Sequence, residues 1–284
     1  MPFVEVGGVS LYYEERGSGP PVVFVHGIPT DYRAWGAQLG PFSKKRRAVA
    51  LSRRYAAPNR REGDVSDSTV HNNAVDLKGF IENVCGGRAD VVGHSFGGFV
   101  SAFLAADHPD LVNSLVLVEP AVATLLVADQ TSGIQALGLL FRSPSVALSG
   151  RRFQTQSLGP SLRALEDGKS DLAVELNVDG VQGVKGAFAG LPPETKQMML
   201  DNARTVAELK TKFPRFTAKE AGLISCPTLV VNGEVSELYL RKIGELMARA
   251  VPGAKRVVVP GTRHFPHMEN ADFFNEKVLG FLGS

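Results

Sequence analysis

The sequence predicts an α/β fold, a mostly parallel, doubly wound sheet with helices on both faces and one helical insertion. Short apolar runs alternate with helix-like segments along residues 1–120 and again along residues 226–284, a pattern typical of parallel strands joined by helices. Between residues 121 and 225 the alternation stops, and helix-like pieces with Gly and Pro breaks dominate. We therefore expect a core of residues 1–120 and 226–284, with residues 121–225 as a helical cap, or lid.

The length and composition fit one large domain, or one domain with an insertion. The chain has 284 residues, of which 44% are hydrophobic and 21% charged, so it can bury a substantial core. A formal net charge of +2 argues against nucleic acid as the main partner. The basic clusters lack interleaved aromatic residues, so we expect them to be solvated surface: Lys44–Arg47, Arg53–Arg54, Arg60–Arg61 and Arg151–Arg152.

No targeting or membrane signal is readable. The first 19 residues contain no basic patch followed by a long apolar stretch, which argues against a signal peptide. No apolar run approaches the roughly 18 residues of a membrane helix, so we expect a cytoplasmic protein without a membrane partner. Cys85 and Cys226 form neither a disulfide framework nor a metal-ligand cluster. No strand is followed by G-x-G-x-x-G, and we expect no metal and no cofactor.

The core elements are predicted from apolar runs and turn residues. Gly7 and Gly8 separate two alternating segments, which predicts a hairpin, and continuous apolar runs predict strands covered on both faces. The predicted strands are Phe3–Val6, Ser10–Glu15, Pro21–Val25, Arg47–Leu51, Asp90–Gly93, Ser114–Val118, Pro227–Val231 and Arg256–Val259. The predicted helices are Tyr32–Phe42, Thr69–Val84, Gly98–Ala106, Glu237–Ala250 and Ala271–Leu282.

A serine stands where one predicted strand turns into a helix. Residues 93–97 read G-H-S-F-G around Ser95, which fits G-x-S-x-G, because small residues on both sides permit a strained strand-to-helix turn. This turn exposes the serine hydroxyl beside a helix N-terminus, where developing negative charge is favoured. The alternative is an ordinary strand-to-helix turn without chemistry.

A serine hydroxyl becomes a good nucleophile only when a base takes its proton. Of the six histidines, His26 and His94 lie in turns that they brace, and His71 and His108 lie on predicted helices as surface residues. His264 and His267 remain, in the loop after the last strand. Loops beyond the carboxyl ends of strands carry functional groups in open α/β sheets, so this loop is the best source of the base.

These motifs resemble those of the α/β-hydrolase superfamily over nearly the whole chain. Residues 26–30, HGIPT, resemble the family's HGxP oxyanion loop, residues 93–98 its nucleophile elbow, and His264-x4-Glu269-x4-Phe274 its histidine loop. The resemblance implies an α/β-hydrolase fold and selects His264 over His267 as the base. It also implies an oxyanion hole made by the backbone N–H groups of Ile28 and Phe96.

The acid of the triad departs from the common pattern. Most members carry an aspartate in G-x-x-D after the strand Pro227–Val231, where this chain has Ser236. Glu119 follows the strand after the elbow, and one branch, including haloalkane dehalogenases and some lactone hydrolases, takes its acid from there. We therefore expect Glu119 to be the acid, with Glu234 and Glu237 as alternatives, unless Glu119 is a solvated strand-end carboxylate.

Residues 26–35, HGIPTDYRAW, also resemble the dehalogenase and epoxide hydrolase branch. The nucleophile of that branch is an aspartate, here Ser95, and the halide-holding asparagine of the dehalogenases is here Ile28. A serine that displaced halide would leave an ether, which water does not readily cleave. Acyl chemistry is therefore the expected use of this serine.

The expected function is a serine hydrolase, esterase-like or lactonase-like, acting through an acyl-enzyme on a small-molecule ester or lactone. Apolar residues of the cap suggest a hydrophobic substrate, although they could equally be lid packing: Leu125, Leu126, Leu139, Leu140 and Phe141. Hydrolysis of a carbon–carbon bond or an amide, or cyanohydrin cleavage, could use the same triad. A non-catalytic ligand receptor of this fold is the alternative from another class.

Overall fold

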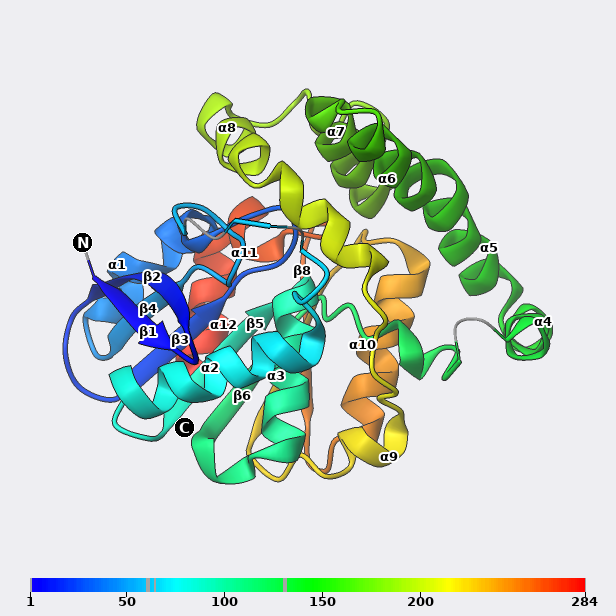
Figure 1. Cartoon of the computed structure of the whole chain (residues 1–284). Helices are drawn as coiled ribbons and strands as arrows, with labels where there is room; N and C mark the ends of the chain where they lie inside the picture. The colour runs from blue at the N-terminus through cyan, green and yellow to red at the C-terminus, as the bar shows by residue number, and fades with distance from the viewer. Residues whose placement is uncertain (1, 60–61, 64, 130–131, 284) are drawn as a thin grey trace.

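An eight-stranded sheet crosses the part of the chain described by the computed structural model, residues 2–59, 62–63, 65–129 and 132–283 (Figure 1). The strands are β1 (Phe3–Val6), β2 (Val9–Arg16), β3 (Pro21–Val25), β4 (Arg47–Leu51), β5 (Ala89–His94), β6 (Val112–Val118), β7 (Thr228–Gly233) and β8 (Lys255–Val259). Their spatial order is β1-β2-β4-β3-β5-β6-β7-β8. β1 and β2 pair antiparallel, as does β2 with β4, and every pair from β4 to β8 is parallel. The predicted hairpin and parallel sheet are confirmed.

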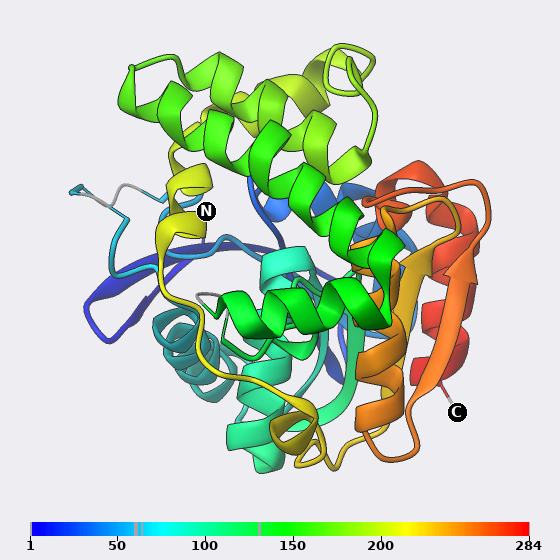
Figure 2. The ribbon, with the colours of Figure 1, turned by 90° about the vertical axis from the view of Figure 1, so that its right-hand side faces the viewer.

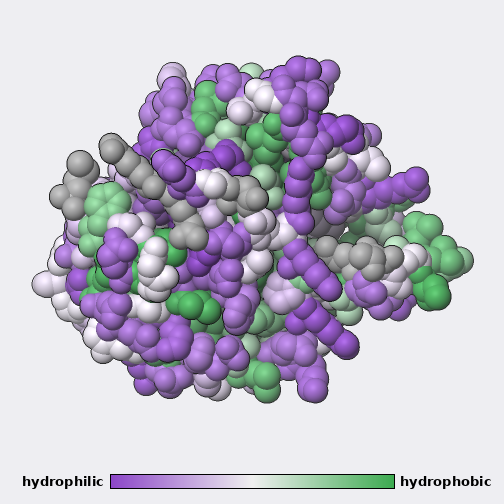
Figure 3. All heavy atoms as spheres, viewed as in Figure 1, coloured by the Kyte–Doolittle hydropathy of each residue, from purple (hydrophilic) through white to green (hydrophobic). Residues whose placement is uncertain are grey.

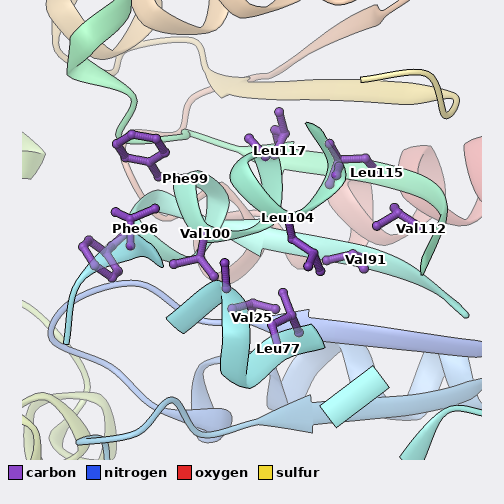
Figure 4. Packing of buried hydrophobic residues seen from close by; sticks show 14 of the residues in the cluster. Val25, Leu77, Val91, Phe96, Phe99, Val100, Leu104, Val112, Leu115 and Leu117 are labelled. Carbon is purple, nitrogen blue, oxygen red and sulfur yellow. The ribbon is translucent and has the colours of Figure 1, made fainter. Parts of the chain in front are cut away.

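Helices cover both faces of the sheet. α2 (Val70–Val84), α3 (Ser95–Asp107) and α10 (Leu238–Ala250) pack on one face, and α1 (Gly36–Ser43) and α12 (Ala271–Leu282) on the other. Successive residues of a strand point to opposite faces, so Val91 joins the first core cluster and Val92 the second. Figure 4 shows part of the first cluster, in which Val91 and Leu115 of the strands lie beside Leu104 of α3.

The chain between β6 and β7 is helical, and we call residues 121–225 the helical segment. Its described residues form no strand; its elements are η3 (Ala123–Leu125), α4 (Gly133–Arg142), α5 (Pro144–Phe153), the π-helical turn η4 (Gln154–Leu158), α6 (Gly159–Glu166), α7 (Ser170–Gln182), α8 (Pro193–Asp201), η5 (Ala203–Lys210) and α9 (Ala218–Ala221). Figure 2 shows most of these helices in a layer above the sheet. That the segment acts as a lid stays a prediction.

Several boundaries differ from the prediction. The helix expected over Tyr32–Phe42 is a 3-10 turn, η1 (Tyr32–Trp35), followed by α1. α3 begins at Ser95 rather than Gly98, because the serine itself occupies the first helical position. Among the described residues, no helix is both long and apolar enough to cross a membrane.

The solvated surface predicted at Arg53–Arg54 is wrong. Arg53 is 3% and Arg54 6% exposed, because each guanidinium pairs with a buried carboxylate, Arg53 with Glu208 and Arg54 with Asp76. A buried charge is tolerated when it is paired and hydrogen-bonded. The cluster Arg60–Arg61 lies outside the described residues.

Candidate active site

Ser95 lies at the junction of β5 and α3, in a backbone conformation unusual for its type. Its φ of +51° is in the left-handed region, which costs free energy for a residue with a side chain. The flanking glycines make room for this turn. A Cβ on Gly93 would collide with Ser101 Oγ, and a Cβ on Gly97 would collide with the backbone carbonyl of His26.

His264 approaches Ser95 from the loop after β8. Its Nε2 lies 3.0 Å from Ser95 Oγ, and both side chains are buried. Glu269 shapes this loop, since its carboxylate accepts hydrogen bonds from the backbone N–H groups of Arg263 at 2.6 Å and Phe265 at 3.1 Å. The spacing His264-x4-Glu269 thus has a physical reason, because the carboxylate holds the backbone on both sides of the histidine.

Gln182, at the end of α7, also holds the histidine loop. Its Oε1 accepts a hydrogen bond from the backbone N–H of His264 at 2.9 Å, and its Nε2 donates to Glu269 Oε1 at 3.0 Å. The side chain is buried. The helical segment therefore contacts the histidine loop directly. Nothing near Gln182 in the sequence predicts this contact with residues more than 80 positions away.

Glu119 lies on the other side of the His264 ring. It follows β6, is fully buried, and has a φ of +47°. Its Oε2 is 3.4 Å from His264 Nδ1, a long contact of the kind common in enzymes without substrate. Its Oε1 accepts hydrogen bonds from the backbone N–H of Gly233 at 2.8 Å and the side chain of Asn232 at 3.0 Å. The end of β7 thus holds the carboxylate through two donors that the sequence reasoning missed.

The two alternative acids have other partners. Glu234 accepts a hydrogen bond from the backbone N–H of Gly261, and Glu237 accepts one from Ser149 Oγ and pairs with Arg152. Among the described residues, the carboxylate within hydrogen-bond distance of His264 is that of Glu119.

Ile28 and Phe96, the residues expected to form the oxyanion hole, border the same pocket as Ser95. Phe96 is the second residue of α3, so its backbone N–H belongs to the first turn, whose donors have no acceptor within the helix. The loop that carries Ile28 passes very close to the nucleophile. A Cβ on Gly27 would lie 2.9 Å from Ser95 Cβ.

The buried ion pair of Arg53 and Glu208 supports the loop that carries Ile28. Arg53 donates from its backbone N–H to His26 Nε2 at 2.9 Å and from its Nε to the His26 carbonyl at 3.0 Å. Its Nη1 donates to Glu208 Oε2, in η5, at 2.8 Å. Burial raises the pKa of the Glu208 carboxyl, and the charge of Arg53 opposes that shift. The helical segment therefore contacts the histidine loop directly and is linked to the loop that carries Ile28 through Arg53.

The neighbouring histidines are buried and serve other contacts. His94 Nε2 donates to the His264 carbonyl at 2.8 Å; burial, and then the nearby rings of His267 and His264, hold the pKa of His94 well below its usual value. His267 packs on Trp35 with ring centroids 4.4 Å apart, and burial lowers its pKa to about 3. Among the described residues, the histidine within hydrogen-bond distance of Ser95 Oγ is His264.

Ser95 and His264 border a cavity of about 740 Å³ beneath the helical segment. Its walls are mainly aliphatic and aromatic, and the predicted cap residues Leu126, Leu139 and Leu140 contribute to them. Leu125 and Phe141 do not. Leu125 packs against the core cluster, and Phe141 is 80% exposed, so neither side chain supports the expectation of a hydrophobic substrate. A cavity of this size and composition can enclose an apolar small molecule. No group of three or more potential metal ligands occurs among the described residues.

Comparison with known proteins places these features in a family. A family model described as "Alpha/beta hydrolase family" matches residues 22–277. The 2-(acetamidomethylene)succinate hydrolase of Mesorhizobium japonicum is 26% identical over 285 residues, covering 98% of this chain and 94% of that protein.

Many solved structures share the fold, including the following two. The esterase EaEST from Exiguobacterium antarcticum has a TM-score of 0.76 at 17% identity, with 99% of both chains covered. Est816, titled an N-acyl homoserine lactone degrading enzyme, has a TM-score of 0.64 at 24% identity and covers 99% of this chain and 100% of its own. Since the family model spans the strands from β3 to β8 and both loops around Ser95, the chain belongs to the alpha/beta hydrolase family of enzymes.

Proposed function

We propose that this protein is a serine hydrolase that cleaves a carboxylic ester or lactone of a hydrophobic small molecule through an acyl-enzyme. The observation that carries the proposal is the hydrogen-bonded series of Ser95 Oγ, His264 and Glu119 at one end of an apolar cavity. This series has the geometry in which a hydroxyl, a base and an orienting acid act together. Residues 121–225 are proposed as the cap of this site, and residues 1–120 and 226–284 as its core.

In the first half of the reaction, Ser95 Oγ attacks the carbonyl carbon while His264 Nε2 takes the hydroxyl proton. Glu119 accepts from His264 Nδ1–H, which keeps Nε2 unprotonated before attack and stabilises the imidazolium afterwards. The carbonyl oxygen becomes an oxyanion that faces the N–H groups of Ile28 and Phe96, each worth about 2.7–4 kcal/mol in the transition state. The carbon–oxygen bond to the alcohol breaks as His264 returns the proton to that oxygen.

In the second half, water replaces the alcohol. His264 takes a proton from the water as the water oxygen attacks the acyl carbon, and the bond to Ser95 Oγ breaks with return of the proton to the serine. The products are a carboxylic acid and an alcohol, which remain one molecule when the substrate is a lactone. The two proposed half-reactions require no cofactor and no metal ion.

Two considerations favour ester or lactone bonds. An aliphatic wall binds the carbon skeleton of an ester without leaving charges unpaired. The esterase and lactone-degrading neighbours share the fold over nearly their whole length, although fold alone does not determine the substrate.

The test is hydrolysis of a panel of nitrophenyl esters and lactones by the wild type and by Ser95→Ala. We expect the variant to lose at least about 10³-fold in kcat, because the hydroxyl has no substitute. Glu119→Gln should lose about 10²-fold or more, whereas Glu234→Gln, the matched control, should stay near the wild type. Activity that survives in Ser95→Ala would refute acyl-enzyme chemistry, and equal losses in the two glutamine variants would refute the role of Glu119.

A further inference from the structure

A buried amide in the cavity wall has no hydrogen-bond partner among the described residues. Asn177, in α7, is 2% exposed and borders the cavity together with Ser95. Its amide forms no hydrogen bond with any other described residue. The amide is not among the fully enclosed polar atoms of the described residues, so it is open to the cavity, where water or a bound molecule can hydrogen-bond it.

Packing does not explain Asn177. Its neighbours along α7 are Val174, Val178 and Val181, which belong to an apolar cluster, and Val181 borders the cavity one turn after Asn177. Asparagine is a poor helix former, so an aliphatic residue would favour both the helix and its environment.

Asn202, which is also buried, shows what a structural asparagine does in this chain. Its Nδ2 donates to Asp31 Oδ2 and its Oδ1 accepts from the backbone N–H of Ala57, both at 2.7 Å. The amide of Asn177 has no such contacts and borders the space where a substrate would bind.

A second polar group of the cavity wall, the hydroxyl of Tyr239, is also uncharged. Tyr239, in α10, is 8% exposed, borders the cavity, and its hydroxyl has no hydrogen-bond partner among the described residues. Burial, with the carboxylates of Glu237 and Glu119, raises the pKa of Tyr239 well above its usual value, so the phenol stays neutral. No described Asp or Glu borders the cavity, and its arginine, Arg151, is exposed.

We propose that Asn177 binds an uncharged hydrogen-bonding group of the substrate, such as an amide, a ketone or a hydroxyl. The substrate is then an ester or lactone whose otherwise apolar body carries one such group away from the reacting carbonyl. A neutral amide suits a neutral partner, because a buried carboxylate is costly without a buried cation, and Arg151, the arginine among the described residues that line the cavity, is exposed. This inference rests on the proposed function, since it assigns a feature to the substrate of Ser95.

The experiment uses 4-nitrophenyl octanoate and a series of isosteric esters in which a secondary amide replaces two neighbouring methylene groups, moved stepwise along the acyl chain. Each ester is assayed with the wild type and with Asn177→Leu, which keeps the branched shape of the side chain but removes its hydrogen-bonding groups. For at least one amide position, we expect the ratio of wild-type to variant kcat/KM to exceed the ratio for plain octanoate about tenfold. Val181→Leu is the control, and it should change all the esters alike.

Binding separates this inference from the proposed function. The methyl ketones of the same series cannot be hydrolysed, and calorimetry gives their affinity for Ser95→Ala and for Ser95→Ala with Asn177→Leu. Tighter binding of an amide-bearing ketone that the second variant loses supports the inference, whether or not the esters are turned over. Ratios that do not vary along the series, or no binding by any amide-bearing ketone, would overturn it. Failure of Ser95 to react with a fluorophosphonate would instead count against the proposed function.

Discussion

Two parts of the helical segment, α7 to η5 and α4, differ in the contacts that they form with the rest of the molecule. At one end, from α7 to η5, Gln182, Asn202 and Glu208 are buried, and each hydrogen-bonds a residue of the core. At the other end, α4 has no buried residue, and Ile134 and Phe141 are 86% and 80% exposed. Figure 1 shows α4 at the margin of the molecule, and Figure 3 shows a group of hydrophobic residues at the same margin.

The two parts differ in whether their contacts are directional. Hydrogen bonds and ion pairs fix the orientation of their partners. The α7–η5 end forms such contacts with the histidine loop, through Gln182, and with Arg53, through Glu208. Apolar contact is not directional, and α4 offers mainly apolar side chains to the cavity and to the surface. The α7–η5 end is therefore held in a fixed orientation beside the loops that border Ser95, whereas α4 is held by contacts that do not fix its orientation.

The largest effect should come from the ion pair of Arg53 and Glu208. Glu208→Ala leaves the buried guanidinium without its carboxylate, which we expect to lower the free energy of unfolding by about 3–5 kcal/mol. Chemical denaturation measures this loss. The control is Glu166→Ala, which removes the exposed partner of Lys210 and should cost less than about 1 kcal/mol. Equal costs would mean that the α7–η5 end is not anchored as described.

A smaller effect should follow from Gln182→Leu, which removes both hydrogen bonds to the histidine loop. We expect kcat for a nitrophenyl ester to fall about tenfold or more, because a displaced base reacts poorly, with little change in KM. The rate of labelling of Ser95 by a fluorophosphonate should fall in parallel. Gln156→Leu, at an exposed position of η4, should leave both rates unchanged. A rise in KM at constant kcat would show that Gln182 supports the pocket rather than His264.

The smallest effect should come from the outer face of α4. Ile134→Ser and Phe141→Ser should change the free energy of unfolding by less than about 0.5 kcal/mol and leave kcat/KM for short esters unaltered. Leu139→Ser, on the cavity side of the same helix, should raise KM for long acyl chains. The prediction fails if the two outer variants unfold as readily as Glu208→Ala.

The sheet was predictable because its signals are local. The buried strands contain short apolar runs. Ser95 was selected by the G-x-S-x-G spacing, and Glu119 by its place after the next strand together with the family resemblance. The supports of the site were not predictable, because Arg53 and Glu208 are 155 residues apart and Gln182 and His264 are 82 residues apart. Arg53 was mistaken for surface because its carboxylate partner cannot be identified from its own neighbourhood. The orientation of Phe141 could not be read from a helix that is apolar on several sides.

Among the described residues other than glycine, the two with a left-handed backbone are Ser95 and Glu119. Such conformations cost on the order of 1–3 kcal/mol each, and glycine would adopt them without that cost. At Glu119 a glycine would also leave the buried donors of Asn232 and Gly233 without their acceptor, so Ser95 is the position where glycine would relieve strain at the lower cost. A search for heat-resistant variants made without an activity screen would then select against the hydroxyl that we propose as the nucleophile.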